Sequence, residues 1–315
     1  MAIGHLLSEL RAPTTPRGKI IVAGLAVLVF SLLSLLVVGG FFLSRVLMPL
    51  QAGETIDPTQ FLGNAQTLEF QTLDGAKHNG WFFPGLRGAP VVIICHGYRS
   101  SRSEILTLAT SLQQHRYNVF AFNFAGHGES PVGHTTLGYR ETEELEAALQ
   151  MLATRDDIDT KRIGLYGYSL GGYAALSAAP TVPGVKAVVV DSVYPDPKAL
   201  LRLELTRLGA DIIPLLSTTA TLEFRLFSMF YRGQEEPPDA LKRMTGVPKL
   251  FIAGDDAPQL GKMTQQLYQD APGPKDLVVL PHTNMPTLVE EERRNYENLV
   301  VSFFLRRLPL VATGP

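Results

Sequence analysis

The sequence contains a single cysteine, Cys95, among 315 residues. One cysteine excludes an intramolecular disulfide framework and any metal site built from several cysteines. Because Cys95 lies within an apolar run, we expect a buried and unreactive thiol. The net charge of −2 lacks the basic excess of nucleic-acid-binding proteins, so no nucleic-acid partner is expected. Internal repeats and low-complexity segments are also absent, which favours a globular chain.

Charged residues are missing from the N-terminal run Ile20–Ser44. As a helix this run would reach roughly 37 Å, enough to cross a hydrocarbon core of about 30 Å with some tilt. A cleaved signal peptide is the alternative interpretation. The apolar run is long for a signal peptide, however, and no clear cleavage site of small residues follows it. The pattern therefore favours an uncleaved signal anchor, with one transmembrane helix over residues 20–44.

Basic residues flank this run unequally. Arg11, Arg17 and Lys19 precede it, whereas after Arg45 the next basic residue is Lys77. Positive charge accumulates on the cytoplasmic side of a membrane helix. We therefore expect a single-pass membrane protein with a cytoplasmic N-terminus and an extracytoplasmic main domain. The expected organisation is a cytoplasmic segment 1–19, the membrane helix, a linker 45–66, a domain 67–308 and a tail 309–315.

The main domain begins with a predicted hairpin and continues with alternating strand and helix patterns. Period-two alternation on either side of Asp74-Gly75 predicts the hairpin. Short apolar runs and longer amphipathic stretches then follow one another, a pattern typical of a mainly parallel sheet covered by helices on both faces. The predicted strands are 67–73, 79–83, 90–95, 118–123, 163–167, 185–190, 249–254 and 277–281. The predicted helices are 103–113, 139–152, 171–179, 263–268 and 288–308.

One segment interrupts the alternation. Residues 195–244 lie between two predicted strands and are too many for a simple crossover. The segment is rich in leucine, isoleucine and phenylalanine. We expect a helical cap insertion over the site, although extra packing at the sheet edge would give the same pattern. An apolar cap favours a substrate with an apolar part.

The rest of the chain is organised around Gly167-Tyr168-Ser169-Leu170-Gly171, which fits G-x-S-x-G. A predicted strand precedes this stretch and a predicted helix follows it. Glycines two residues before and after the serine remove Cβ atoms that would collide in so sharp a turn. The serine hydroxyl would then stand exposed at the carboxyl end of a strand.

Three motifs together resemble those of the α/β-hydrolase superfamily. They are Cys95-His96-Gly97-Tyr98, the stretch from Phe122 to Ser130 with Gly126-His127-Gly128, and Gly167–Gly172. The chain is most similar to small membrane-anchored serine hydrolases of bacterial type, related to esterases and peptidase-like lipases. The resemblance covers about residues 66–307. It implies an α/β-hydrolase fold with a mainly parallel eight-stranded sheet, and a reaction that needs no cofactor and no metal.

The resemblance also implies a catalytic triad in the chain order serine, acid, histidine. Ser169 is the expected nucleophile, and His282 is the only histidine that follows it. Asp256 follows the strand 249–254 and is the expected acid, with Asp255 as a fallback. Asp191, at the end of the strand 185–190, is a second fallback because some members of the superfamily carry an acid there.

The spacing departs from the superfamily pattern at two of these positions. The acid usually stands where this chain has Ala257, and the histidine usually stands where it has Met285. A triad of Ser169, His282 and Asp256 therefore requires a compensating loop conformation. The alternative is that His282 is an ordinary loop histidine.

Backbone amides should complete the site. The N–H groups of Tyr98 and Leu170 are the expected oxyanion hole, because one follows the His96-Gly97 turn and the other begins a helix. His96 precedes the serine and is expected to brace its loop. The resemblance makes His127 structural as well.

Two functions follow from these patterns. The first is a membrane-anchored serine hydrolase that cleaves a carboxylic ester with an apolar acyl group, on a small-molecule or lipid-like substrate. A peptide or amide bond is the alternative substrate. The second is a degenerate, non-catalytic hydrolase fold that binds a ligand or partner. The sequence does not indicate an oligomeric state.

Overall fold

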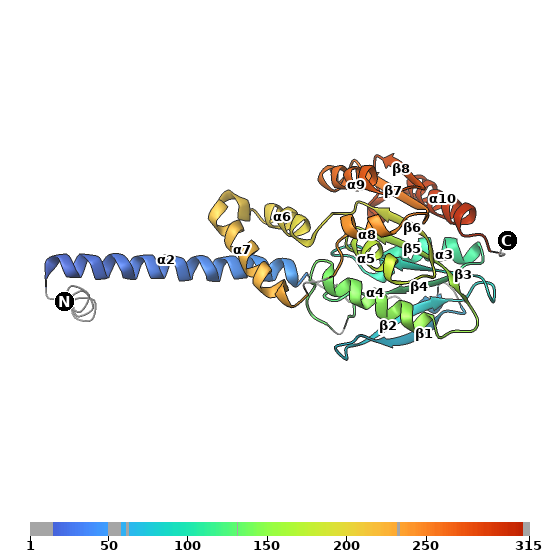
Figure 1. Cartoon of the computed structure of the whole chain (residues 1–315), viewed down its shortest axis with the longest axis horizontal. Coiled ribbons are helices and arrows are strands. Elements are labelled where there is room, and N and C mark those ends of the chain that lie inside the picture. The colour runs from blue at the N-terminus through green and yellow to red at the C-terminus, as the bar shows by residue number, and fades with distance from the viewer. Residues whose placement is uncertain (1–14, 50–57, 61–62, 131, 232–233, 311–315) are drawn as a thin grey trace. The chain divides into compact units, whose positions relative to one another are not determined.

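The computed structural model describes residues 15–49, 58–60, 63–130, 132–231 and 234–310 (Figure 1). Its described residues form an eight-stranded sheet in the order β1-β2-β4-β3-β5-β6-β7-β8. β1 pairs with β2, and β2 with β4, in antiparallel fashion, and all other neighbours pair in parallel. The strands are β1 Gln66–Gln71, β2 Lys77–Phe83, β3 Pro90–Cys95, β4 Asn118–Phe122, β5 Asp159–Tyr168, β6 Val185–Asp191, β7 Lys249–Gly254 and β8 Lys275–Leu280.

Burial explains why the central strands could be read from the sequence. Every residue of β3 and β7 is buried, as expected of parallel strands that helices cover on both faces. Both strands have the bounds that the apolar runs predict. β8 is different, because it lies at the end of the sheet and its residues are only partly buried. The weaker apolar signal of this edge strand accounts for the shift from the predicted 277–281.

Helices cover the two faces of the sheet (Figure 1). One face carries α3 Leu106–Gln114 and α10 Glu290–Arg307, which contact each other. On the other face lie α4 Tyr139–Leu152, α5 Leu170–Ala178, α8 Pro237–Arg243 and α9 Pro258–Asp270. Short 3₁₀ turns complete the described elements: η1 Pro58–Gln60, η2 Arg102–Ile105, η3 Ala179–Thr181, η4 Ala210–Ile212, η5 Ser228–Tyr231 and η6 Met285–Thr287.

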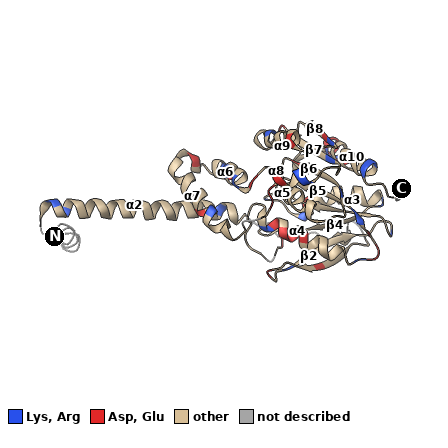
Figure 2. Ribbon diagram, in the orientation of Figure 1, with Lys and Arg blue, Asp and Glu red and all other residues tan. Residues whose placement is uncertain are grey.

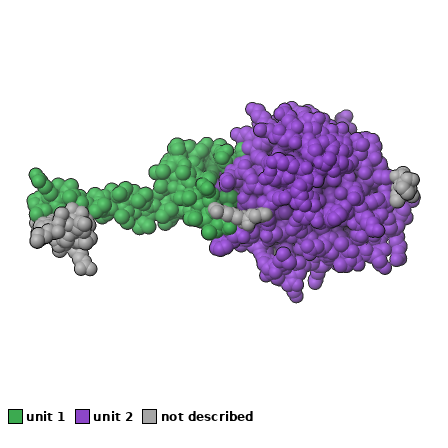
Figure 3. Space-filling view, in the orientation of Figure 1, with its two compact units in different colours: residues 1–46, 202–229 green, residues 47–201, 230–315 purple. Residues whose placement is uncertain are grey.

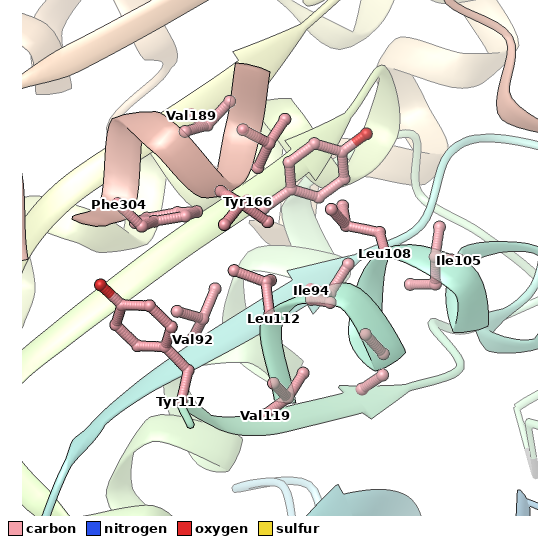
Figure 4. Close-up of a cluster of buried hydrophobic side chains, with 14 of the residues drawn as sticks. Val92, Ile94, Ile105, Leu108, Leu112, Tyr117, Val119, Tyr166, Val189 and Phe304 are labelled. Carbon is pink, nitrogen blue, oxygen red and sulfur yellow. The ribbon is translucent and has the colours of Figure 1, made fainter. Parts of the chain in front are cut away.

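The buried core beneath α3 and α10 is aliphatic and aromatic (Figure 4). Side chains of β3, β4 and β5 meet those of the two helices there. The labelled members are Val92, Ile94, Ile105, Leu108, Leu112, Tyr117, Val119, Tyr166, Val189 and Phe304. This packing fixes the strands whose carboxyl ends carry the candidate site.

The sequence underestimated one helix. α9 begins at Pro258, whereas the sequence predicted a helix only over 263–268. Proline is favoured in the first turn of a helix, where its missing N–H costs nothing. The helix therefore starts almost directly after β7, and it keeps the loop that carries Asp255 and Asp256 short.

The apolar N-terminal run forms the single helix α2 Pro16–Leu47. Within the described residues it is the only helix long and apolar enough to cross a membrane. Figure 2 shows basic residues at its N-terminal end and no charge along its middle. The predicted segment 20–44 lies inside this helix. Of the predicted segment 1–19, linker 45–66 and tail 309–315, residues 1–14, 50–57, 61–62 and 311–315 lie outside the described residues.

The chain divides into two compact units (Figure 3). One contains α2 up to Val46 together with Arg202–Met229, and the other contains the sheet and the remaining helices. The predicted insertion 195–244 is helical, as expected, and contains α6 Pro197–Arg207, α7 Pro214–Phe227 and α8. It does not form one body, because α8 packs on α5 and α9 whereas α7 belongs with α2. Its role as a cap over the site stays a prediction.

Candidate active site

Ser169 stands at the turn between β5 and α5, as the sequence predicted. Its backbone has φ 49° and ψ −107°, a conformation that costs a non-glycine residue on the order of 1–3 kcal/mol. Two hydrogen bonds hold the turn. The Ser169 N–H donates to the Asp191 carbonyl at 2.8 Å, and the Tyr173 N–H donates to the Ser169 carbonyl at 2.9 Å. The surrounding fold thus maintains the strained turn, but Ser169 is only 4% exposed, so the prediction of an exposed hydroxyl is wrong for this conformation.

The glycines of the turn allow backbone segments to approach closely. A Cβ atom at Gly167 would lie 2.2 Å from the Gly171 carbonyl oxygen. One at Gly171 would lie 2.2 Å from the carbonyl oxygen of Cys95, at the end of β3. No side chain fits at either position. The close approach brings the N-terminus of α5, with Leu170, against the loop after β3 that carries Tyr98.

His96 braces this loop rather than acting as a base. Its Nδ1 lies 2.8 Å from the Gly97 carbonyl oxygen, to which it donates, and its Nε2 accepts the Phe124 N–H at 3.0 Å. Both ring nitrogens are therefore engaged. Burial lowers the pKa of His96 to about 4, so the ring is neutral at pH 7. The structure agrees with the bracing role expected from the sequence.

Tyr98 and Leu170 lie at the same edge of the sheet. Tyr98 follows Gly97 beyond the end of β3, and Leu170 is the first residue of α5. The last residue of β3, Cys95, pairs with Gly167 of β5, so the two chain segments leave the sheet side by side. Amides at a helix N-terminus favour negative charge. The arrangement is compatible with the expected oxyanion hole, which stays a prediction.

His127 is buried next to these groups. Its Nδ1 lies 2.8 Å from the Ala125 carbonyl oxygen, and its ring lies 5.7 Å from that of Tyr98 and 5.3 Å from that of His96. Burial, with His96 nearby, lowers the pKa of His127 to about 3. A neutral ring held by a turn carbonyl fits the structural role that the resemblance implied.

Asp256 is engaged by the loop after β8. Its Oδ2 accepts the N–H of Thr283 at 3.0 Å and that of Asn284 at 3.2 Å. The Thr283 hydroxyl lies 3.5 Å from Asp256 Oδ1 and 3.4 Å from the hydroxyl of Ser192. Thr283 is fully buried. The side chain that stands between Asp256 and the end of β6 is therefore that of Thr283, and no motif in the sequence predicts this position.

The side chain of His282 has a different partner. Its side chain is 56% exposed, and its Nδ1 lies 2.9 Å from Oε1 of Glu292 in the first turn of α10. The His282 hydrogen bond is the largest cause that lowers the pKa of Glu292. The described hydrogen bonds include none from His282 to Asp256 or Ser169. The predicted triad residues share one region of the fold, but this conformation does not bring the histidine to the serine.

The two fallback acids also have other partners or positions. Asp255 is exposed after β7, and its N–H donates to the Leu280 carbonyl at 2.9 Å. Asp191 is fully buried, and its Oδ2 accepts the Tyr296 hydroxyl at 2.6 Å. Burial raises the pKa of Asp191 to about 7. Asp191 therefore ties β6 to α10 and supports the Ser169 turn through its backbone carbonyl.

The position where the superfamily pattern expects histidine belongs to the core. Met285 is buried in the cluster beneath α3 and α10, close to Leu288. An ionisable side chain there would lose hydration without gaining a partner. Within the described residues, no group of three or more histidine, cysteine or acidic side chains could hold a metal ion.

Comparison with known proteins identifies the class. The sequence model of the alpha/beta hydrolase family matches residues 92–308, most of the chain, so the protein belongs to this family. Among curated relatives, the uncharacterized protein YfhR of Escherichia coli K12 is 24% identical over 254 residues, which cover 78% of this chain and 82% of YfhR. The uncharacterized protein Rv2307c of Mycobacterium tuberculosis is 28% identical over 246 residues, which cover 76% of this chain and 79% of Rv2307c.

Solved structures include esterases. The Pyrococcus furiosus esterase Pf2001 superposes with a TM-score of 0.63 at 24% identity, over 84% of this chain and 98% of the esterase. The esterase domain of a Rhodothermus marinus protein superposes with a TM-score of 0.56 at 18% identity, over 78% of this chain and the whole domain. At these identities the likeness shows the shared fold. The family and its esterase neighbours support a hydrolase.

Proposed function

We propose that the protein hydrolyses a carboxylic ester with Ser169 as the nucleophile. The observation that carries the proposal is the strained conformation of Ser169, which the fold maintains at the carboxyl end of the sheet. Strain of this kind persists where a function requires it. A packing role would be served equally well by a glycine at this position, without the backbone strain.

In the proposed reaction Ser169 Oγ attacks the acyl carbon, and the carbonyl oxygen becomes an oxyanion between the N–H groups of Tyr98 and Leu170. His282 takes the serine proton and returns it to the departing alkoxide. The acyl-enzyme is then cleaved by water, which His282 deprotonates in turn. Asp256 orients the imidazole and stabilises its protonated form.

This scheme requires a rearrangement of residues 281–284. His282 must leave Glu292 and reach the Asp256 carboxylate, whose Oδ2 accepts the amides of Thr283 and Asn284. The His282–Glu292 contact lies at the surface, and exposed polar pairs of this kind contribute little to stability. His282 directly precedes Thr283, so a local change of backbone can exchange one neighbour of Asp256 for the other.

A second function is favoured by the same contacts. The Asp256 carboxylate is occupied by backbone amides, and His282 is held at the surface by Glu292. A hydrolase fold with this arrangement as its permanent state would bind a ligand at Ser169 without turnover.

A fluorophosphonate probe distinguishes the two functions. The full-length protein in detergent is treated with the probe beside Ser169→Ala, His282→Ala and Asp256→Asn. The hydrolase proposal expects labelling of the wild type, no labelling of Ser169→Ala and strong loss in the other two variants. Labelling that is absent, or unchanged by His282→Ala, contradicts the proposed triad. A series of p-nitrophenyl esters of increasing acyl length, run beside a p-nitroanilide, then tests ester against amide and the preference for an apolar acyl group.

We further propose that α2 anchors the protein in a membrane with its N-terminus in the cytoplasm. Support comes from the charge-free length of the helix and from Arg17 and Lys19 at its start. Protease added to intact spheroplasts should digest the hydrolase domain. Digestion that requires lysis of the cytoplasmic membrane contradicts this orientation.

A further inference from the structure

The unit that contains α2 also contains α7, although the two helices are far apart in the sequence. Figure 1 shows α7 lying across α2. The contact is close because α2 has two consecutive glycines there. A Cβ atom at Gly39 would lie 2.9 Å from Cγ2 of Thr219 and 3.4 Å from the Ala220 nitrogen, and one at Gly40 would lie 3.4 Å from Glu223 Oε2. Small residues that let two backbones approach are typical of helix pairs in membranes.

The position of this contact along α2 determines how deep it would lie in a bilayer. Gly39 lies five residues before Ser44, the last residue of the charge-free run, so the contact is about 7 Å along the axis from the end of that run. If α2 spans a bilayer, α7 therefore crosses it near the boundary between acyl chains and headgroups. Interfacial helices bury their apolar faces about 5–10 Å into this layer.

The outer surface of α7 is apolar at this depth. Leu215, Leu222, Leu226 and Met229 follow one another at spacings of seven, four and three residues, which places them on one face of the helical segment. All four are exposed, Leu215 and Leu226 by about 60%. In the 3₁₀ turn before α7, Ile212 is 83% exposed. Water is an unfavourable environment for a contiguous apolar surface of this kind.

A groove of about 590 Å³ lies between α6, η4 and α7. Arg202 and Arg225 line it from two sides, together with the hydroxyl-bearing Thr206 and Ser217. In the described parts of the chain neither arginine has an ion-pair partner. Asp211 also lines the groove and offers an acceptor to a headgroup hydroxyl. Guanidinium groups beside hydroxyls bind a phosphate well.

We propose that the segment Arg202–Met229 is seated in the bilayer interface, with its leucine face among acyl chains and a phospholipid phosphate between Arg202 and Arg225. The occupant is the bilayer because the apolar face continues onto the helix proposed to span it. The inference thus rests on the proposed membrane anchor. It is independent of the chemistry at Ser169.

Depth-sensitive labelling tests the seating. The full-length protein is reconstituted into liposomes of phosphatidylcholine and phosphatidylglycerol with an NBD fluorophore on Leu222→Cys or Leu226→Cys. Cys95 is fully buried, so the introduced thiol is the reactive one. Both labels should emit at shorter wavelength than in water, and doxyl lipids should quench them. Leu73→Cys, fully exposed in the hydrolase domain, is the aqueous control, and Leu28→Cys reports on α2 itself.

The outcomes separate the two proposals. A quenched label at Leu28→Cys with aqueous labels at Leu222→Cys and Leu226→Cys overturns the seating and leaves the anchor intact. An aqueous label at Leu28→Cys overturns the anchor and the seating with it. Labels on α7 that are shielded from water but not quenched by lipid show a protein cover, such as a second copy of the chain, and also overturn the seating.

Lipid binding tests the groove. In native mass spectrometry of the protein in detergent, added phosphatidylglycerol should bind several-fold more tightly to the wild type than to Arg202→Gln or Arg225→Gln. Arg207→Gln is the matched control, because Arg207 pairs with Glu204 and does not line the groove. Inorganic phosphate in excess should not displace the lipid. Equal binding by all four proteins, or displacement by inorganic phosphate alone, overturns the phospholipid site.

Discussion

His282 and Glu292 are in hydrogen-bond contact on the surface, with 2.9 Å between Nδ1 and Oε1. The pair links the loop after β8 to the first turn of α10. It holds away from Asp256 the only histidine that follows the candidate nucleophile in the sequence. In the proposed triad, turnover of a substrate requires this contact to break.

Glu292→Gln should raise the rate at which a fluorophosphonate labels Ser169. The substitution removes the charge that favours the surface position of His282, so the loop reaches Asp256 more often. We expect a few-fold increase in the second-order labelling rate, measured on the protein in detergent. Glu291→Gln is the matched control, since Glu291 lies in the same exposed turn without contacting His282. A lower rate in Glu292→Gln than in the control would mean that the pair supports the active conformation.

Gly171→Ala should destabilise the protein and abolish labelling. The added methyl would lie 2.2 Å from the Cys95 carbonyl oxygen, a backbone atom that the central sheet fixes. Overpacking of this kind costs about 1–3 kcal/mol or more, measured as the free energy of unfolding in denaturant. At Gly133 an added methyl meets no atom within 4 Å, so Gly133→Ala should stay within about 0.5 kcal/mol of the wild type. Equal effects of the two substitutions would refute the steric argument.

The fold and the elbow could be predicted because they depend on local patterns. The apolar runs of β3 and β7 and the glycines around Ser169 each report on their own neighbourhood. The partners of the other site residues depend on a loop of a few residues. Asp256 accepts the Thr283 amide and His282 contacts Glu292, and the predicted triad contains neither contact. A choice between similar polar contacts leaves no periodic pattern in the sequence.

The contact of α2 with α7 was missed for a different reason. Gly39 and Thr219 are far apart in the sequence, and neither departs from what an apolar helix ordinarily contains. The sequence therefore suggested one cap, whereas the structure divides the insertion between two units.

Asp191→Asn should change how stability depends on pH. The pKa of Asp191 is raised by burial from 3.8 to about 7, so the folded protein retains a proton that the unfolded chain releases near pH 4. Stability is therefore lost as the pH rises through this window. Between pH 5 and 8 the free energy of unfolding of the wild type should fall by about 3 kcal/mol, and the variant should not show this loss. Urea unfolding of both proteins at each pH gives the difference in their free energies of unfolding. The buried His96 and His127 are present in both proteins, so their contributions cancel in this difference. A difference that does not change with pH would show that Asp191 is charged throughout.

Glu141→Ala should weaken the loop before α4. The buried Glu141 carboxylate accepts the N–H of Thr136 at 3.1 Å, its hydroxyl at 2.9 Å and the N–H of Gly138 at 2.8 Å. Removing it leaves these donors buried without a partner, at a cost of about 1–3 kcal/mol for each unsatisfied group. Glu141→Gln keeps one acceptor oxygen and should cost less.

Glu141→Ala should also affect the candidate site. Gly138 packs against Tyr173 of α5, where a Cβ atom would lie 2.4 Å from the ring. Glu141→Ala should therefore also slow the labelling of Ser169. Glu146→Ala, which changes a partly exposed residue of the same helix, is the control. Comparable losses of stability in Glu141→Ala and Glu146→Ala would contradict the role of the buried carboxylate.

Thr283→His should supply a base without a movement of the loop. Thr283 already stands between Asp256 and the end of β6, and the carbonyl of Asp191 there accepts the Ser169 N–H. An imidazole at this position can donate to Asp256 and direct its other nitrogen toward the serine. The larger ring must displace neighbours, because Thr283 is fully buried and Gly254 lies against it, so about 1–3 kcal/mol of stability should be lost. We expect at least about tenfold faster fluorophosphonate labelling than in the wild type, the scale of general base catalysis.

The faster labelling of Thr283→His should depend on the residues of the new triad. It should survive in the double variant with His282→Ala, because the new imidazole replaces His282 as the base. It should be lost in the double variant with Asp256→Asn or Ser169→Ala. Thr287→His adds the same side chain at an exposed position of the neighbouring turn and should leave the rate unchanged. If Thr283→His folds, by its unfolding transition, and still labels no faster than Thr287→His, then the Asp256 side of the site does not face Ser169, and the proposed triad would have to be abandoned with it.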